Sequence, residues 1–433
     1  MRALRSGTAR RALLWLVVVL PLLFNPYTNT PSEPIKVSVF RWAVFGILVL
    51  TLLERRGSLR LIGKSLFSPR ALTIELAVAV YGVALVLSTV FSLDRSLSFW
   101  GGSDKHGLLT WLAVWILFGI IISSGRDPAW IRALVDAVLV STVPVCLYAL
   151  AQFAGLDPLE WVTDSVSEMT STLGRSNTVG AYIAATAPFA LLRLRDSCKE
   201  GRSALSSGRA LALVALQVSV VLLSQARAAW LGLIAGTAVF AVVVGRPRPS
   251  RRRRWLAAGL SAGVLVAALL SVVDLSSLRS SVSSDALASF GAKRLQTLES
   301  RWMIWRETLA LVPENPLLGY GPETFSTVFH APEDSMPVND PHNVLLEHLV
   351  ATGAIGLGAF CLLFAVFARQ VKQGLAESRD DHDAAVLAAL AGSATAYLVQ
   401  ALFNPDTIVL HLIFWLDLGL VASPTGTVSV PDA

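Results

Sequence analysis

Residues 300–356 read SRWMIWRETLALVPENPLLGYGPETFSTVFHAPEDSMPVNDPHNVLLEHLVATGAIG, and this polar stretch lies between two long apolar parts of the chain. It combines arginines and aromatic side chains with the turn formers Pro and Gly. The polar part of this stretch ends in the pair His342 and Asn343, which comes directly before the next apolar run. The sequence before the stretch has the composition of a membrane scaffold. Reactive groups are therefore expected in this stretch and in the other loops on its side of the membrane.

The composition excludes an ordinary soluble protein. Of the 433 residues 54% are hydrophobic and 15% are charged, whereas soluble domains carry about 25% charged residues. One crossing needs about 20 apolar residues, so the apolar runs predict an all-α polytopic membrane protein with about twelve transmembrane helices. The three cysteines have no metal-ligand spacing and form no disulfide framework.

The distribution of basic residues predicts how the chain is oriented. Cytoplasmic loops carry an excess of Lys and Arg, and this rule leaves both termini inside. Residues 1–274 are then expected to form transmembrane helices 1–9, residues 275–341 a large extracytoplasmic (periplasmic) loop, and residues 342–433 transmembrane helices 10–12. The basic run Arg251–Arg254 is interpreted as a contact with anionic membrane lipids, so no nucleic-acid partner is expected.

The large loop carries the pattern of an amphipathic helix. Its apolar residues recur at spacings of three and four, and they are Leu295, Leu298, Trp302, Trp305, Leu309 and Val312. Such a helix is expected to lie in the membrane interface with its tryptophans at headgroup depth. Anchoring alone explains this stripe. It does not explain why arginines, among them Arg301 and Arg306, cluster beside it.

Two further positions have both a structural and a functional interpretation. Arg227, in SQARAAW, lies between two apolar helices with no acidic residue nearby. It is either an arginine that snorkels to headgroups or a fixed cation for a phosphate or pyrophosphate. His342 is either a residue of a helix start or a reactive group beside the arginines. In the helix that follows, Gly353 and Gly356 are expected to permit close approach of another helix.

The spacing of His342, Asn343, nine intervening residues, Gly353, two residues and Gly356 resembles the signature of the O-antigen ligase and O-antigen polymerase superfamily. The segments SQARAAWLGLIAG, SRWMIWRETLAL, NPLLGYGPETF and TLGRSNTVGAYIA also resemble segments of this family. The resemblance extends over nearly the whole chain and is strongest from Ser171 onward. It implies a multi-pass membrane glycosyltransferase of the GT-C class in the bacterial cytoplasmic (inner) membrane. Its active site would lie on the periplasmic or extracellular side.

The resemblance also implies the reaction and the roles of individual residues. A glycan linked to undecaprenyl pyrophosphate would be moved to an acceptor, which is a glycan, a lipid A-core or a protein. No metal and no cofactor would take part. His342 would be the catalytic base or would position the acceptor, and the substrate-binding residues would be Arg227, Arg301, Arg306, Arg175 and Asn343. In the loop GGSDKHG, Lys105 stands where many relatives have an arginine.

This chemistry is consistent with the residue types themselves. A departing lipid pyrophosphate gains negative charge, and guanidinium groups bind phosphate oxygens in a bidentate manner. A neutral histidine can accept the proton of a sugar hydroxyl that attacks the anomeric carbon. A single displacement of this kind inverts the anomeric configuration. No two acidic residues of the large loop form an obvious glycosidase pair.

Three alternatives remain open from the sequence. A repeat-unit polymerase of the same superfamily shares the donor and differs in the acceptor. Some members of the superfamily have been labelled inorganic-carbon transporters, but a transporter is expected to hold ionisable residues in mid-membrane. The predicted spans contain few of these apart from Arg41, Glu75 and Asp136. A non-enzymatic scaffold would leave the arginines and the histidine unexplained. The enzymatic hypothesis requires that His342, Arg227 and Arg301 meet.

Overall fold

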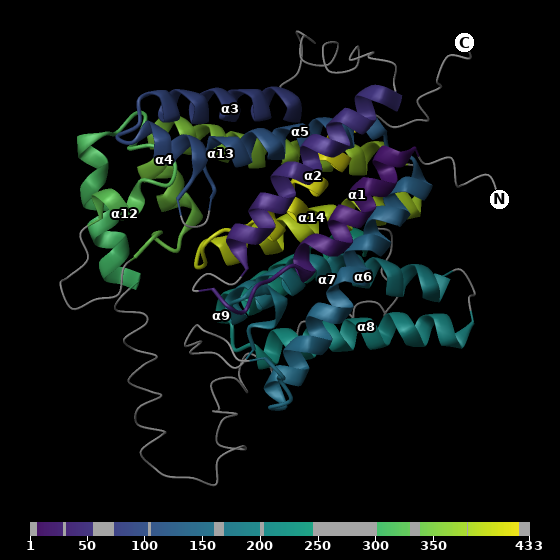
Figure 1. The fold of residues 1–433 in the computed structure, drawn as a ribbon. Helices are drawn as coiled ribbons and strands as arrows, with labels where there is room; N and C mark the ends of the chain where they lie inside the picture. Colours follow the sequence, from purple (N-terminus) through teal and green to yellow (C-terminus); the bar gives the residue numbers. More distant parts are fainter. Residues whose placement is uncertain are drawn as a thin grey trace.

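The structure is a computed structural model that describes residues 7–28, 32–54, 73–102, 105–159, 169–199, 203–245, 301–329, 338–378 and 380–423. Within these ranges the regular structure is helical, without strands (Figure 1). Its principal helices are α1 (Thr8–Val19), α2 (Glu33–Glu54), α3 (Ile74–Val90), α4 (Arg95–Trp100), α5 (Leu108–Ser124), α6 (Pro128–Phe153), α7 (Ser176–Lys199), α8 (Ala204–Leu223), α9 (Arg227–Val244), α12 (Phe325–Val328), α13 (Val344–Glu377), α14 (Asp381–Ala401) and α15 (Ile408–Ala422).

The helices agree with a membrane protein. By length and composition, α2, α6, α8, α9, α13 and α14 can each cross a membrane, and α3, α5 and α15 are shorter apolar helices. The all-helical class is confirmed. The expected number of about twelve spans stays a prediction, because the expected span over 255–273 and the first part of the large loop, residues 275–300, lie outside the described residues.

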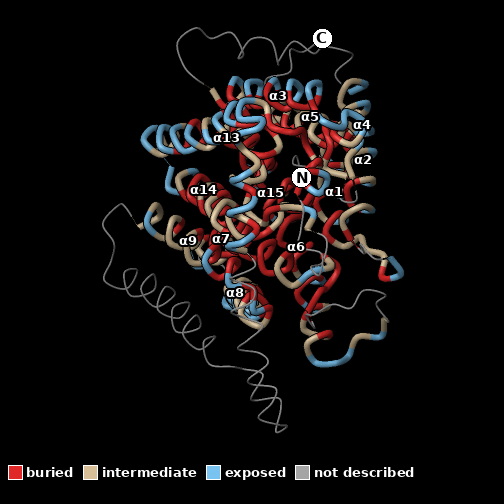
Figure 2. Tube along the Cα trace, turned by 90° about the vertical axis from the view of Figure 1, so that its left-hand side faces the viewer, coloured by how far each residue is buried: buried red, intermediate tan, exposed pale blue. Residues whose placement is uncertain are grey.

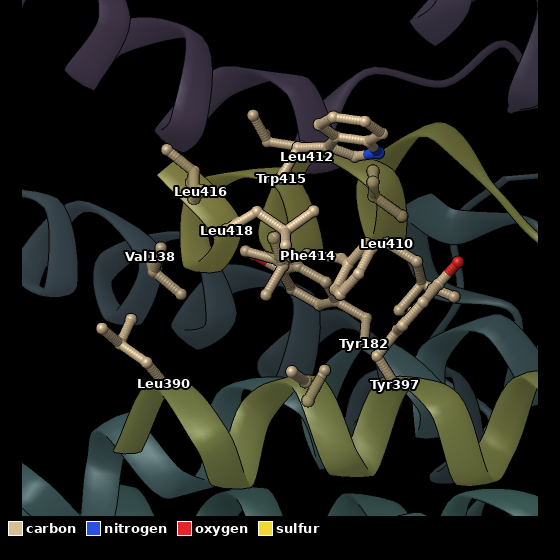
Figure 3. Packing of buried hydrophobic residues seen from close by; sticks show 14 of the residues in the cluster. Val138, Tyr182, Leu390, Tyr397, Leu410, Leu412, Phe414, Trp415, Leu416 and Leu418 are labelled. Atoms are coloured by element: carbon tan, nitrogen blue, oxygen red, sulfur yellow. The ribbon is translucent and has the colours of Figure 1, made fainter. Parts of the chain in front are cut away.

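The bundle is organised around its last helix, α15. Every residue from Ile408 to Val421 is buried, as expected for a helix whose residues are apolar on every face apart from His411 and Asp417. The ring of Phe414 stacks on Phe364 of α13 at 4.8 Å and on Tyr397 of α14 at 4.7 Å between centroids. Figure 3 shows Phe414 and Tyr397 in this interior, whereas α13 presents exposed turns at the edge of the bundle (Figure 2).

Small residues hold α9 closely against α14. A Cβ atom added at Gly232 would lie 2.8 Å from the carbonyl oxygen of Ala396, and one added at Gly236 would lie 2.6 Å from that of Gly392. Glycines at such positions let helix backbones approach more closely than larger residues allow. The first residue of α9 is Arg227, so this packing fixes the position of that arginine.

Helix α13 is interrupted at Gly353, where φ is 65° and ψ is −170°. The segment 315–321, NPLLGYG, fills the interruption with four backbone hydrogen bonds. They run from Tyr320 N to Val350 O (2.9 Å), from Gly321 N to Ala351 O (2.9 Å), from Ala354 N to Pro316 O (2.8 Å) and from Ile355 N to Leu317 O (3.2 Å). The sequence predicted a close approach of another helix at this glycine. The close approach is instead made by this loop segment.

The helix over 301–311 differs from the predicted amphipathic stripe. Ile304 and Thr308 are buried, and Ile304 belongs to a small apolar cluster with residues of α12 and α13. Trp302 and Leu309 are exposed, at 69% and 51% of their surface. The helix therefore packs against other parts of the protein through this cluster. Only part of the predicted stripe is exposed and can contact lipid. The start of the stripe, Leu295 and Leu298, lies outside the described residues.

Besides histidines, one aspartate and one lysine of the described residues are buried within helices that are candidate or shorter apolar spans. Asp417 of α15 is 1% exposed and lies beside Ser393. Lys36 of α2 is also 1% exposed, and its ammonium group donates to the carbonyl oxygen of Thr172 at 2.7 Å. The sequence interpretation did not count Asp417 among the ionisable residues of the spans, and it placed Lys36 at the edge of one. It was incomplete on this point.

Candidate active site

The polar loops gather at one end of the bundle, with α4 and α12 on the left of Figure 1. Among the described residues, five that are not glycine have a positive φ, and all of them lie in these loops: Lys105, Ser171, Gln225, Glu323 and His342. Such backbone conformations cost about 1–3 kcal/mol each and collect at functional sites. These strained residues mark this end of the molecule as a candidate functional site.

The turn before α13 holds His342 in a defined orientation. Asp340 Oδ1 accepts a hydrogen bond from the backbone N–H of His342 at 2.7 Å and lies 2.5 Å from its Nδ1. The indole N–H of Trp305 donates to the carbonyl oxygen of Pro341 at 3.0 Å, which ties the turn to the helix over 301–311. With its proton on Nδ1, facing Asp340, the neutral imidazole presents Nε2 as an acceptor. The His342 side chain is 34% exposed.

Asn343 has a structural role in the described site. It is the N-cap of α13, and its Oδ1 accepts hydrogen bonds from the backbone N–H groups of Leu345 at 2.9 Å and Leu346 at 3.2 Å. Capping of this kind satisfies N–H groups that have no partner within the helix. The predicted contact of Asn343 with substrate stays a prediction, and its amide oxygen is already engaged.

The structure brings Arg301 close to both Arg227 and Asp340. Partial burial lowers the pKa of Arg301, the positive charge of Arg227 lowers this pKa further, and the carboxylate of Asp340 raises it. Within the described residues, neither guanidinium forms a hydrogen bond or an ion pair. Two cations therefore repel each other beside the His342 turn without a carboxylate in contact with either. This arrangement favours an anionic ligand between them.

The start of α9 adds to this positive potential. Arg227 is exposed at the first position of the helix, and the N-cap residue Ala226 provides no side-chain acceptor. The first N–H groups of a helix lack partners within it, and the helix dipole makes that end positive. The N-terminus of the 18-residue helix α9 and the guanidinium groups of Arg227 and Arg301 thus contribute positive charge to the same region.

The remaining predicted cations differ in their environment. Arg306 is exposed on the helix over 301–311, and Arg175 is exposed directly before α7. A Cβ atom added at Gly180 of α7 would touch Ala226, so Arg175 lies at the same end of the bundle as Arg227. Lys105 is engaged, because its ammonium group donates to Ser38 Oγ at 2.9 Å.

A cavity lies next to this site and shares Asp340 with it. Its wall contains carboxylates and histidines that the sequence analysis did not select, namely Glu323, Glu347, Asp406, His106, His348 and His411. Glu347 and His348 could have been selected from the segment LLEHL, because they follow His342 by five and six residues in the same predicted helix. The others come from segments that the chain keeps far apart. Within the described residues, no group of three or more His, Cys, Asp or Glu residues is arranged to hold a metal ion.

The cavity wall is held by two histidine–carboxylate pairs. Nε2 of His106 lies 2.8 Å from Oε1 of Glu33, and Nε2 of His411 lies 2.8 Å from Oδ2 of Asp406. The two imidazole rings are 5.4 Å apart. Burial by itself would raise the pKa of Asp406, but His411 and a hydrogen bond from Tyr397 hold this pKa below its ordinary value. Asp406 is therefore a carboxylate that the fold keeps ionised.

The comparisons with known proteins concern the part of the chain that contains these residues. Residues 210–361 match the family model described as O-Antigen ligase, and this match supports the O-antigen ligase superfamily. The region is roughly a third of the chain, and it includes Arg227, Arg301 and His342. The resemblance predicted from the sequence is confirmed by this match. No curated protein matches the chain.

Proposed function

We propose that this protein is an O-antigen ligase-like glycosyltransferase that moves a glycan from undecaprenyl pyrophosphate to an acceptor on the outer face of the bacterial inner membrane. One observation carries the proposal. Arg227, at the N-terminus of α9, and Arg301, which lies near both Arg227 and Asp340 of the Asp340–His342 pair, have no hydrogen-bond or ion-pair partner among the described residues. The family match over residues 210–361 supports the general reaction.

The two arginines would bind the pyrophosphate of the donor. Guanidinium groups form bidentate hydrogen bonds to phosphate oxygens, and these are stronger than bonds between neutral groups. Negative charge on the pyrophosphate grows as its bond to the sugar breaks, so cations placed there stabilise the transition state more than the ground state. The bound anion would also relieve the repulsion between Arg227 and Arg301.

The histidine would activate the acceptor. Nε2 of His342 takes the proton of an acceptor hydroxyl as its oxygen attacks the anomeric carbon of the donor. A new glycosidic bond forms, and the undecaprenyl pyrophosphate leaves with the electron pair of the bond that breaks. The attack occurs opposite the leaving group and inverts the configuration. Asp340 orients the imidazole and stabilises its positive charge, and no step requires a metal ion.

A repeat-unit polymerase is the alternative within the same superfamily. It would use the same donor site and the same base, because both enzymes transfer a glycan from a lipid pyrophosphate. Only the acceptor differs. It is the growing glycan in a polymerase and a lipid A-core or another terminal acceptor in a ligase.

The test replaces His342, Arg227 and Arg301 singly by Ala in a host that lacks the native gene. Surface polysaccharide is then compared on gels, with the amount of inserted protein measured for each variant. Each substitution is expected to abolish most of the ladder, whereas Arg209→Ala, an exposed arginine near the start of α8, is the control and should leave it intact. Loss of all attached polymer indicates a ligase, and attachment of a single repeat unit indicates a polymerase. Normal ladders from all three stable variants would refute the proposal.

A further inference from the structure

The cavity beside the Asp340–His342 pair has an unusual charge. Its described wall includes the carboxyl groups of Glu323, Asp340, Glu347 and Asp406, and it includes no Lys or Arg. Three of these carboxylates have structural partners. Glu323 accepts from the backbone N–H groups of Gly102 at 2.8 Å and His106 at 3.2 Å, Asp340 holds His342, and Asp406 holds His411.

Glu347 is different from the other three carboxylates. It lies in the first turn of α13, where its backbone N–H donates to the carbonyl oxygen of Asn343 at 2.9 Å. Its side chain forms no hydrogen bond or ion pair with the described residues, although it lines the cavity. Polar groups away from bulk water are normally paired, because an unpaired one costs about 1–3 kcal/mol. A carboxyl group that has no partner among the described residues and lines a cavity is suited to form a hydrogen bond with a ligand.

A second polar group in the wall also lacks a partner. His411 is 3% exposed, and its buried Nδ1 has no hydrogen-bond partner among the described residues, whereas its Nε2 faces Asp406. Aromatic rings complete this part of the wall. Trp111 lies 4.8 Å from the His411 ring and 5.5 Å from the Tyr81 ring. Aromatic surface with a few unsatisfied polar groups is typical of a small-molecule site.

The cavity and the arginines share one neighbouring residue. Asp340 lines the cavity, hydrogen-bonds to His342 and interacts with Arg301. The cationic region suits an anionic group, and a cavity lined by carboxyl groups disfavours one. The two regions thus suit the two different substrates of a transfer reaction, and the residue that holds His342 borders both.

We propose that this cavity binds the terminal sugar of the acceptor, and that it selects a sugar without phosphate or carboxylate groups. This inference rests on the proposed function. Glu347 accepts a hydrogen bond from one hydroxyl of that sugar and places another hydroxyl toward His342. Glu347 is a specificity residue in this scheme, because the proton of the reacting hydroxyl goes to the histidine.

The first test measures acceptor binding without catalysis. Purified His342→Ala protein without donor is titrated with the acceptor glycan isolated from a host lacking this gene, and binding is followed by tryptophan fluorescence or calorimetry. Adding Glu347→Ala is expected to weaken binding by about threefold to tenfold, as for the loss of one hydrogen bond between neutral groups. The matched control is Glu307→Ala, which changes an exposed residue on the helix over 301–311. Equal affinities in the Glu347→Ala protein and its parent would overturn the inference.

The second test uses the active protein. Glu347→Ala is expected to raise the KM for the acceptor by a similar factor, with kcat and the KM for the lipid-linked donor within about twofold of the wild-type values. Wild-type protein is expected to reject the same acceptor after its terminal sugar has been oxidised to a uronic acid. Efficient use of the uronic acid, or a change confined to the donor KM, would contradict the acceptor site while leaving the transferase function intact. Absence of any transfer by wild-type protein would instead refute the proposed function, and the inference with it.

Discussion

Replacement of Gly353 by Ala is expected to destabilise the protein strongly, because this glycine is the point at which α13 is interrupted. Its φ of 65° and ψ of −170° lie in a region that other residues adopt only with strain. A Cβ atom at this position would lie 2.2 Å from the carbonyl carbon of Leu317 and 2.5 Å from the backbone nitrogen of Leu318. The substitution therefore forces the segment 315–321 away from α13 or distorts the helix.

The magnitude follows from two contributions. Backbone strain at such a position costs about 1–3 kcal/mol. Displacement of the segment weakens its four backbone hydrogen bonds, each of which contributes about 0.5–1.5 kcal/mol net. If half of that contribution is lost, the total is roughly 2–6 kcal/mol, which is a large part of the 5–15 kcal/mol that stabilises a typical protein.

The measurement is thermal unfolding of the detergent-solubilised protein, followed by the loss of the monodisperse peak in size-exclusion chromatography. Gly358→Ala, on the same helix, is the matched control, because a Cβ atom there meets nothing within 4 Å. This control is expected to be neutral, or more stable by up to about 1 kcal/mol from helix propensity. If Gly353→Ala unfolds at the same temperature as Gly358→Ala, the described interruption of α13 is wrong.

Three other substitutions test separate parts of the site. Asp340→Asn is expected to lower kcat by about 10²-fold with little change in the donor KM, because His342 loses the negative charge that stabilises its protonated form; steady-state kinetics of transfer measure this. Asp406→Asn is expected to lower the unfolding temperature at neutral pH. Since the folded pKa of Asp406 is depressed, its contribution is present above about pH 4 and is lost as the pH falls through that folded pKa, so the two melting curves should converge in acid. Tyr81→Phe removes the hydroxyl that lies 2.8 Å from Nε2 of His348 and is expected to destabilise the protein by about 1–3 kcal/mol; an unchanged melting temperature would argue against this buried contact.

The sequence was sufficient to predict the all-helical class of the described residues. Long apolar runs identify spans because each crossing needs a continuous apolar length, and the helix that begins at Val344 was predicted with the correct start. Arg227, Arg301 and His342 were selected from local motifs, and the structure brings Arg227 and Arg301 together beside the Asp340–His342 pair.

The cavity could not be predicted in the same way. Tyr81, His106, Glu347 and His411 belong to four different helices or loops, and hydrophobic periodicity does not reveal which helix faces meet. The interruption at Gly353 was missed for a related reason. A glycine inside an apolar run indicates close packing, but the sequence does not show that a distant loop segment, and not another helix, is the partner.

The contact between α13 and residues 315–321 also affects how the chain tolerates a change of length. Together with the turn at Asp340 it holds both ends of the intervening chain, residues 322–339, at one helix. Lengthening a chain whose ends are already held costs little, since each doubling adds only about 0.6 kcal/mol of closure entropy. A change of length between these two anchors is therefore expected to leave the interruption of α13 and the His342 turn in place.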